Sequence, residues 1–275
     1  MRLDNKHGIH VNEHQETIVN LRNKIHGLRE ILHFDNWPEL VLKRTFLTAN
    51  PLAVYRAGGM DILVDHSAGD ENGVREAMVS PMYRNLIGSL SFDTPINVMD
   101  LGANAGGFSL LLNLMKIPLK KVCAVEMNPN TFSRMRFNLE RNLDCALDLT
   151  NAAVCGERTT FKLFLGRGST GDSLYSGGGS GKPYEVQGVT LDDVYAASFA
   201  GETVDLMKLD VEGAEYDILA SPFRECLKQV RNLIIEIHHI PGRLQNEVTE
   251  ALVAAGFVER GRSDSDVFLF HNPTA

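Results

Sequence analysis

Residues Ile96–Gly107 read I-N-V-M-D-L-G-A-N-A-G-G, and this stretch decides the fold. Its first half, Ile96–Leu101, is apolar enough for a buried strand. The glycines that follow let the backbone turn tightly into a helix, which we expect over Phe108–Met115. The next apolar run, Val122–Glu126, predicts a second strand. Strand, glycine turn, helix and strand in this order are typical of a nucleotide-binding α/β unit.

Strands continue to alternate with helices towards the C-terminus. Asn128-Pro129 predicts a helix start, with asparagine as the N-cap and proline at the first helical position. Because several of the strands are near-continuous apolar runs, we predict an α/β fold whose mainly parallel sheet is covered by helices on both faces. The further strands are expected at Leu147–Val154, Thr159–Leu165, Val204–Asp210, Leu233–His238, Phe257–Arg262 and Val267–His271, with a helix at Leu244–Ala255.

The first 94 residues follow a different pattern. Apolar residues at helical spacing predict an amphipathic helix over residues 15–34, which Trp37-Pro38 ends. Gly58-Gly59 predicts a hairpin turn between short strands, and a second helical stretch covers Gly73–Gly88. We therefore divide the chain into an N-terminal extension of helices and a hairpin, residues 1–94, and a main domain, residues 95–275.

Composition excludes several classes of protein. The chain has 275 residues and a net charge of −8, with its positive residues scattered. Nucleic-acid-binding proteins usually carry a basic face, so we expect no nucleic-acid partner. No apolar run approaches the ~20 residues of a membrane span, and the N-terminus lacks an apolar signal-peptide core. We therefore expect no membrane association and a cytoplasmic location. The spacing of the four cysteines predicts reduced thiols.

The glycine loop and a following acid indicate the ligand. Glu126 stands at the end of the next strand, twenty residues after Gly106, where an acid hydrogen-bonds ribose hydroxyls. Asn104 replaces the middle glycine that brings a pyrophosphate close to the helix. A carboxylate at Asp100 would suit a cationic ligand and repel a pyrophosphate. The sequence thus favours S-adenosylmethionine (SAM), which is a cation, over a nicotinamide dinucleotide.

Two further strand ends carry ionisable residues. Strand alternation puts Lys208 and Asp210 on one face, and likewise Glu236 and His238. In open α/β sheets the carboxyl ends of the strands form the ligand edge. His238 is our first choice for a general base and Asp210 the second. A metal site of Asp210, Glu236 and His238 is an alternative. For Lys208, Glu236 and Glu215 a purely structural role is equally open.

Together these stretches resemble the FkbM family of methyltransferases, over about Ile96–His238. The resemblance implies a Rossmann-like class I methyltransferase fold with seven strands, and SAM-dependent O-methylation of a small-molecule acceptor, a sugar or a secondary metabolite of natural-product biosynthesis. Residues 1–94 would then shape the acceptor pocket or cap it. The matching motifs are Asp100–Gly107, Glu126–Pro129, Asn151–Val154, Val189–Asp193 and Lys208–Glu215.

The resemblance also implies roles for single residues. The SAM loop would consist of Gly102, Asn104 and Gly106, with Asp100 beside it. Glu126 would hold the ribose next to Met127, and Asn151 and Ala152 would border the adenine. Asp210 would face SAM or the acceptor, and Asp172–Leu174 would form a serine-containing loop of the family.

Several alternatives stay open at this stage. An NAD(P)-dependent oxidoreductase would share the fold and the ribose acid, and a non-catalytic SAM-binding module would share the loop as well. The Gly/Ser-rich stretch Gly166–Lys182 is either a flexible connection or a lid. The acceptor and the quaternary state, a homodimer included, are also open.

Overall fold

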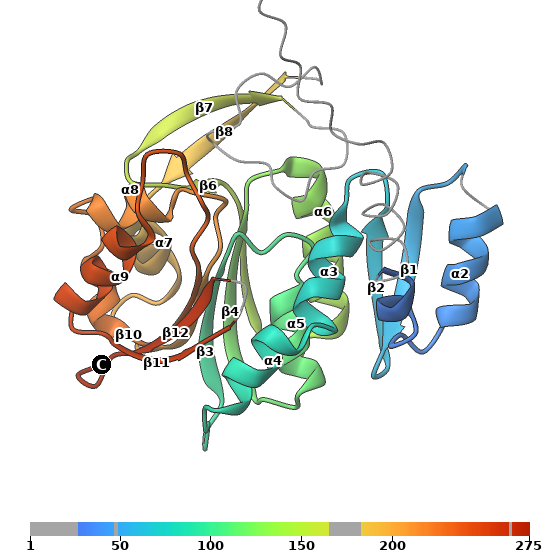
Figure 1. Ribbon diagram of the computed structural model, residues 1–275, viewed down its shortest axis with the longest axis horizontal. Helices are drawn as coiled ribbons and strands as arrows, with labels where there is room; N and C mark the ends of the chain where they lie inside the picture. The colour runs from blue at the N-terminus through green and yellow to red at the C-terminus, as the bar shows by residue number, and fades with distance from the viewer. Residues whose placement is uncertain (1–26, 47–48, 165–182, 264–265) are drawn as a thin grey trace, which may run out of the picture.

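The computed structural model describes residues 27–46, 49–164, 183–263 and 266–275, and a seven-stranded sheet forms its centre (Figure 1). The strand order is β11-β12-β10-β9-β3-β4-β5. The strands from β10 to β5 pair in parallel, whereas β12 runs antiparallel to β10 and to β11. The predicted α/β fold with a mainly parallel seven-stranded sheet is confirmed. The strands are β3 (Ile96–Leu101), β4 (Leu119–Glu126), β5 (Ala146–Asn151), β9 (Val204–Leu209), β10 (Val230–Glu236), β11 (Val258–Arg262) and β12 (Val267–His271).

Helices cover both faces of this sheet because the central strands are apolar on both sides. Along β3, Val98 packs into the core on one face, and Met99 and Leu101 pack into the core on the other. One face carries α3 (Asp70–Met78), α4 (Pro81–Gly88), α5 (Gly107–Leu114) and α6 (Pro129–Asn142), and the other carries α7 (Leu191–Ser198), α8 (Glu215–Ala220) and α9 (Gln245–Ala254), with a 3-10 turn at Glu225–Gln229 (Figure 1).

The N-terminal segment contains the predicted hairpin, β1 (Leu52–Ala57) and β2 (Met60–Asp65), turning at Gly58-Gly59. Two details of the helix predictions were wrong: the end assigned to Trp37-Pro38 and the continuity of Gly73–Gly88. Residues 15–26 of the first predicted helix lie outside the described residues. Trp37-Pro38 begins α2 (Trp37–Phe46) rather than ending a helix, because proline is well tolerated in a first turn. Of the helix predicted over residues 15–34, the described part is helical only at residues 27–31. The single helix predicted over Gly73–Gly88 is split into α3 and α4, since Ser80 caps α4 ahead of Pro81.

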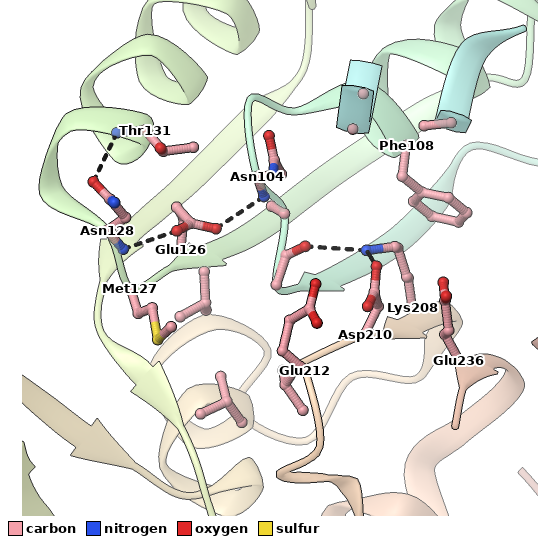
Figure 2. Close-up of a pocket in the computed structure, with 18 of the residues that line it drawn as sticks. Asn104, Phe108, Glu126, Met127, Asn128, Thr131, Lys208, Asp210, Glu212 and Glu236 are labelled. Carbon is pink, nitrogen blue, oxygen red and sulfur yellow. Dashed lines mark hydrogen bonds and ion pairs between the residues drawn. The ribbon is translucent and has the colours of Figure 1, made fainter. Parts of the chain in front are cut away.

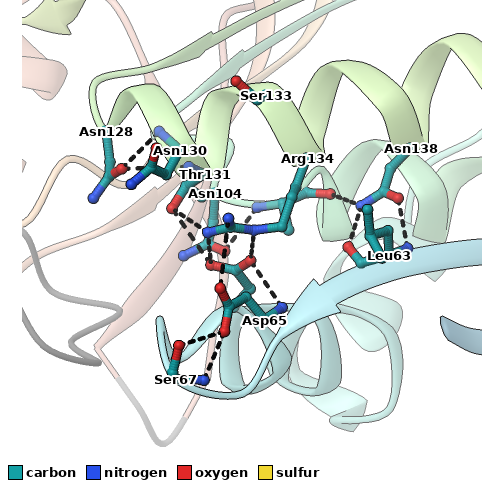
Figure 3. Close-up of polar contacts among 12 residues, drawn as sticks. Leu63, Asp65, Ser67, Asn104, Asn128, Asn130, Thr131, Ser133, Arg134 and Asn138 are labelled. Atoms are coloured by element: carbon teal, nitrogen blue, oxygen red, sulfur yellow. Dashed lines mark hydrogen bonds and ion pairs between the residues drawn. The ribbon is translucent and has the colours of Figure 1, made fainter. Parts of the chain in front are cut away.

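Polar contacts fasten the hairpin to α6 (Figure 3). The side chain of Asn138 accepts a hydrogen bond from the backbone nitrogen of Leu63 (2.7 Å) and donates one to its carbonyl (2.9 Å). Asn142 does the same with Asp61, at 3.1 and 2.8 Å. Arg134 pairs with Asp70 at the start of α3. The same hydrophobic core also contains Ile62 of the hairpin, so the core continues across the predicted boundary at residue 94.

A small second sheet differs from the prediction. The strand expected at Leu147–Val154 divides into β5 of the main sheet and β6 (Ala153–Val154). β6 pairs with β8 (Pro183–Val189), which in turn pairs with β7 (Thr159–Phe164) in a three-stranded sheet. The sequence pattern did not reveal β8 or α7. Gly166–Lys182 and Asp172–Leu174 lie outside the described residues. Within the described ranges, no helix combines the length and the apolar character that a bilayer crossing requires.

Candidate functional site

A cavity opens where β3, β4, β9 and β10 end, at the carboxyl edge of the parallel strands (Figure 2). Its empty volume is about 1050 Å³, the open mouth included. The residues that line it come mainly from the segments after these strands and after β5, and from α3, α4, α5 and α6.

The glycine loop after β3 forms one wall. Gly102 lines the cavity with a φ of +74°, and a Cβ there would lie 1.7 Å from the carbonyl oxygen of Asp210. Asn104 also lines the cavity and has a φ of +50°. Gly106, with a φ of +88°, precedes α5 and packs against Leu139 of α6 instead of facing the cavity. Gly106 therefore supports the conformation of the loop without lining the cavity.

Glu126 is fixed at the end of β4. Its Oε2 accepts a hydrogen bond from the backbone nitrogen of Asn104 (3.0 Å), and its Oε1 accepts one from that of Asn128 (2.8 Å). The carboxylate lines the cavity although only 8% of the residue is exposed. Asn128 in turn caps α6 by accepting from the nitrogen of Thr131 (Figure 2). The acid is thus held in one orientation at the cavity wall.

Of the residues predicted to border the adenine, some line the cavity and one lies behind it. Met127 and Ala152 line the cavity, together with Ala153 and Val154 that follow. Asn151 does not line the cavity. Its side chain donates hydrogen bonds to the carbonyls of Glu126 (2.8 Å) and Met127 (2.9 Å). Asn151 therefore holds the turn after β4 in place.

Asp100 lies elsewhere than we expected from the sequence. It is still inside β3, fully buried, and its side chain accepts a hydrogen bond from Ser109 of α5 (2.7 Å). It is absent from the cavity lining, and burial raises its pKa. Its carboxylate lies 4.0 Å from the ammonium of Lys208. Asp100 thus supports the loop from within the sheet and does not face a ligand.

Lys208 links β9 to the glycine loop. Its Nζ donates a hydrogen bond to the carbonyl of Gly102 (3.0 Å) and pairs with Asp210 (2.8 Å). Burial alone would lower its pKa, but the neighbouring carboxylates of Asp210 and Asp100 raise it above its usual value. Lys208 therefore stays charged and ties the two strand ends together.

His238 is the centre of an acidic cluster at the other end of the cavity. Its Nδ1 lies 3.0 Å from Oε1 of Glu215, which is fully buried. Its Nε2 lies 3.3 Å from Glu212, 3.7 Å from Asp210 and 4.0 Å from Glu236. The structure thus brings Asp210, Glu236 and His238 together, as the predicted metal set requires, and adds Glu212 at a shorter distance.

The acidic neighbours shift several pKa values in this cluster. Burial opposes the charge of His238, but the carboxylates of Glu215, Asp210 and Glu212 outweigh it and raise the pKa to about 9. Burial raises the pKa of Glu212 to about 7 and that of Glu236 to about 8. The cluster therefore favours a bound positive charge.

The sequence motifs did not predict the cavity-lining residues that the N-terminal helices α3 and α4 contribute. Asp70, Gly73 and Glu76 of α3 and Tyr83 of α4 line the cavity, and the hydroxyl of Tyr83 donates to Glu236 (3.3 Å). A Cβ on Gly73 would lie 2.9 Å from Asn104, so this glycine lets the loop approach α3. The spacing of three residues between these α3 positions places them on one helix face, a signal the sequence did contain.

Comparisons with known proteins agree with these features. The family model of the methyltransferase FkbM domain matches residues 100–259. Methyltransferase sdnD of Sordaria araneosa is 28% identical over 200 residues, which cover 61% of this chain and 76% of that protein.

Solved structures show more distant likenesses. Methyltransferase FkbM from Methylobacillus flagellatus KT has 14% identity and a TM-score of 0.49, over 92% of this chain and 60% of that one. TrmK of M. capricolum, solved with S-adenosylhomocysteine, has 11% identity and a TM-score of 0.43, over 72% of this chain and 70% of that one.

Proposed function

The chain belongs to the FkbM family of methyltransferases, and from this premise we propose that it transfers the methyl group of SAM to a hydroxyl oxygen of a sugar or natural product. One observation carries the proposal. A single cavity joins Asn104 and Glu126 at one end to Asp210 and His238 at the other, with Gly102 next to Asp210. A nucleoside at the first end would present its reactive group to an acceptor at the second.

The residues at the first end fit SAM. The fixed carboxylate of Glu126 suits the two ribose hydroxyls, and Met127 and Ala152 offer an apolar border to the adenine. SAM carries a sulfonium and an ammonium group, so a surplus of carboxylates favours it. The cavity lining includes the carboxylates of Asp70, Glu76, Glu126, Asp210, Glu212 and Glu236 against the cations Lys208 and His238.

The same charges argue against the oxidoreductase alternative. The pyrophosphate of a nicotinamide dinucleotide would enter a site lined by more carboxylates than cations. Asn104 occupies the position of the middle glycine of the dinucleotide fingerprint. Phosphate-rich nucleic acid is disfavoured as an acceptor for the same electrostatic reason.

The second end suits the acceptor. Tyr83, Glu76 and Glu236 form a polar wall that adjoins the cluster around His238, and α3 and α4 supply two of these residues. This is the role in the acceptor pocket that we predict for the N-terminal segment. A polar wall with hydrogen-bonding groups on several sides matches an acceptor that carries several hydroxyls.

A neutral hydroxyl attacks poorly, so its proton has to leave as the new bond forms. We assign this activation to the predicted catalytic pair, whose members lie 3.7 Å apart in the cavity wall: Asp210 would take the proton, and His238, with a pKa of about 9, would orient and stabilise that carboxylate as an imidazolium. SAM supplies a methyl group on a positively charged sulfur, which takes the electron pair of the breaking carbon–sulfur bond. The protein contributes by holding both reactants in line, which can lower the barrier by ~7–11 kcal/mol.

A transfer assay tests the proposal. Purified full-length protein is incubated with methyl-labelled SAM and a panel of sugars, glycosides and hydroxylated natural products, and the labelled atom is located by NMR. We expect label on oxygen, with one S-adenosylhomocysteine formed per product. Label on nitrogen or carbon would contradict O-methylation, and SAM binding without transfer to any acceptor would favour the non-catalytic module.

A further inference from the structure

We propose that the cluster around His238 is a divalent-cation site, with Nε2 of His238 and the carboxylates of Asp210 and Glu212 as ligands. The proposal deepens the proposed function and rests on it for its catalytic role, because the cation would activate the acceptor hydroxyl. The binding site itself follows from the geometry of these side chains.

The distances of two carboxylates from Nε2 of His238 suit the first shell of a metal ion. Carboxylate oxygens of Glu212 and Asp210 lie 3.3 and 3.7 Å from Nε2 of His238. Metal–ligand bonds of ~2.0–2.2 Å at tetrahedral angles separate neighbouring ligand atoms by roughly 3.3–3.6 Å. Glu236, at 4.0 Å from the same nitrogen, is placed to take a proton or to join the shell.

Glu215 supplies the outer shell that such sites require. Metal-bound histidines usually donate their other ring nitrogen to a carboxylate, which fixes the ring orientation. Here Oε1 of Glu215 lies 3.0 Å from Nδ1 of His238 and also accepts a hydrogen bond from the backbone nitrogen of Val211 (3.0 Å). This arrangement turns Nε2 towards Asp210 and Glu212.

The buried carboxylate of Glu215 has one oxygen that accepts no hydrogen bond within the described ranges, which also favours a bound cation nearby. Glu215 has no exposed surface, and this oxygen is its Oε2. One oxygen each of Glu215 and Asp210 and a ring nitrogen of His238 lie within 4.8 Å of one another. A buried anion of this kind is costly without a compensating charge.

The carboxylates around Nε2 favour a positive charge there, which either the ring proton of an imidazolium or a bound cation can supply. With the Nδ1 proton directed at Glu215, a neutral ring would point its Nε2 lone pair at carboxylate oxygens, which are acceptors as well. Lys208 does not supply the positive charge at Nε2, because its ammonium already contacts the carbonyl of Gly102 and the carboxylate of Asp210. One imidazole with carboxylates is a donor set suited to Mn²⁺ or Zn²⁺.

The cation gives the reaction a route for the proton. An acceptor hydroxyl beside the ion has a lowered pKa, so its O–H bond breaks more easily. The proton passes to Glu236, the oxygen forms its bond to the methyl carbon, and Glu236 later releases the proton to solvent. The electron pair of the breaking carbon–sulfur bond stays on sulfur, so the step needs neither an oxidant nor a reductant.

Mn²⁺ titration of the metal-free full-length protein, without SAM, tests the site by electron paramagnetic resonance. We expect one saturable site whose spin-echo spectrum shows a directly bound imidazole nitrogen. His238→Ala and Asp210→Asn should weaken binding at least tenfold, and Glu215→Gln by ~10–100-fold. His239→Ala is the matched control: this neighbouring histidine is exposed and outside the cavity lining, and its substitution should leave binding unchanged.

The outcomes separate this proposal from the proposed function. Absence of saturable Mn²⁺ and Zn²⁺ binding, or equal binding in His238→Ala and His239→Ala, would overturn the cation site. Circular dichroism of each variant verifies folding, and Glu212→Gln near the cavity mouth is a milder second probe. SAM binding measured on the same metal-free protein reports on the proposed function independently. Full transfer activity after chelation would reject the cation and leave Asp210 as the direct base.

Discussion

The carboxylate of Glu126 lies 3.0 Å from the backbone nitrogen of Asn104, so the acid at the end of β4 directly holds the loop that follows β3. The second oxygen of the carboxylate is fixed by the nitrogen of Asn128. Two neighbouring strands thereby present a glycine loop and an oriented acid to the same cavity. We therefore expect ligand binding and the loop conformation to depend on the same side chain.

Glu126→Ala should weaken SAM binding at least tenfold. The substitution removes an ionised acceptor, whose hydrogen bonds contribute ~1.5–3 kcal/mol each, and also releases the loop at Asn104. Glu126→Gln should fall between this variant and the wild type, because one acceptor oxygen remains. Calorimetric titration measures the effect, with Glu140→Gln on the exposed face of α6 as control. Equal affinity of Glu126→Ala and the control would reject the assignment.

Gly102→Ala should prevent the loop from forming. The residue has a φ of +74°, and the added Cβ would lie 1.7 Å from the carbonyl oxygen of Asp210. We expect a loss of several kcal/mol in the free energy of unfolding, together with loss of SAM binding. Gly59→Ala is the matched control, since it has a φ of +85° but open space around it. Urea denaturation should show a cost of only about 1 kcal/mol for the control.

Arg134→Met should detach the N-terminal segment from α6. Arg134 pairs with Asp70, whose side chain is 1% exposed, and the substitution leaves that carboxylate buried and unpaired (Figure 3). Breaking a buried pair in this way costs about 3–5 kcal/mol. Denaturation of Arg136→Met, two residues along the helix, supplies the comparison, because its partner Glu140 is an exposed neighbour. Similar stabilities of the two variants would contradict the proposed anchoring.

His66 should make the folded state sensitive to acid. Burial, aided by Arg44 and Arg75, lowers its pKa from 6.5 to about 4. The unfolded chain therefore takes up this proton first, and stability is lost as the pH falls from about 6.5 towards 4. Allowing for partial exposure, the effect amounts to about 1–2 kcal/mol.

Urea denaturation at pH 7.5 and pH 4.5 measures this difference. His66→Gln, which keeps a hydrogen-bonding group near Tyr55, should lose less stability on acidification than the wild type. His33→Gln, at an exposed position, should behave like the wild type. The interpretation fails if all three proteins lose the same free energy between the two pH values.

The sequence predicts best where local chemistry and tertiary structure agree. Ile96–Leu101, the glycine loop and Glu126 occur in the predicted order, since a buried strand and a tight turn each need particular residues. The convergence of Asp210 and His238 was also predictable, because neighbouring parallel strands end at one edge of the sheet.

Other features depend on contacts that no local pattern contains. Asp100 has the residue type of a ligand contact, but Ser109 and Lys208 enclose it within the sheet. The strand predicted over Leu147–Val154 is divided because its last two residues pair with a different sheet. Glu76 and Tyr83 reach the cavity only because α3 and α4 pack on the main domain, which requires a long-range arrangement.

Calorimetric titration of the purified chain with SAM and S-adenosylhomocysteine, with NADH and NADPH as comparisons, tests the central claim most directly. We predict micromolar binding of both sulfur ligands, its loss in Glu126→Ala, and no heat from either nicotinamide. Binding of a nicotinamide without either sulfur ligand would contradict the account and make the chain a nucleotide-dependent oxidoreductase.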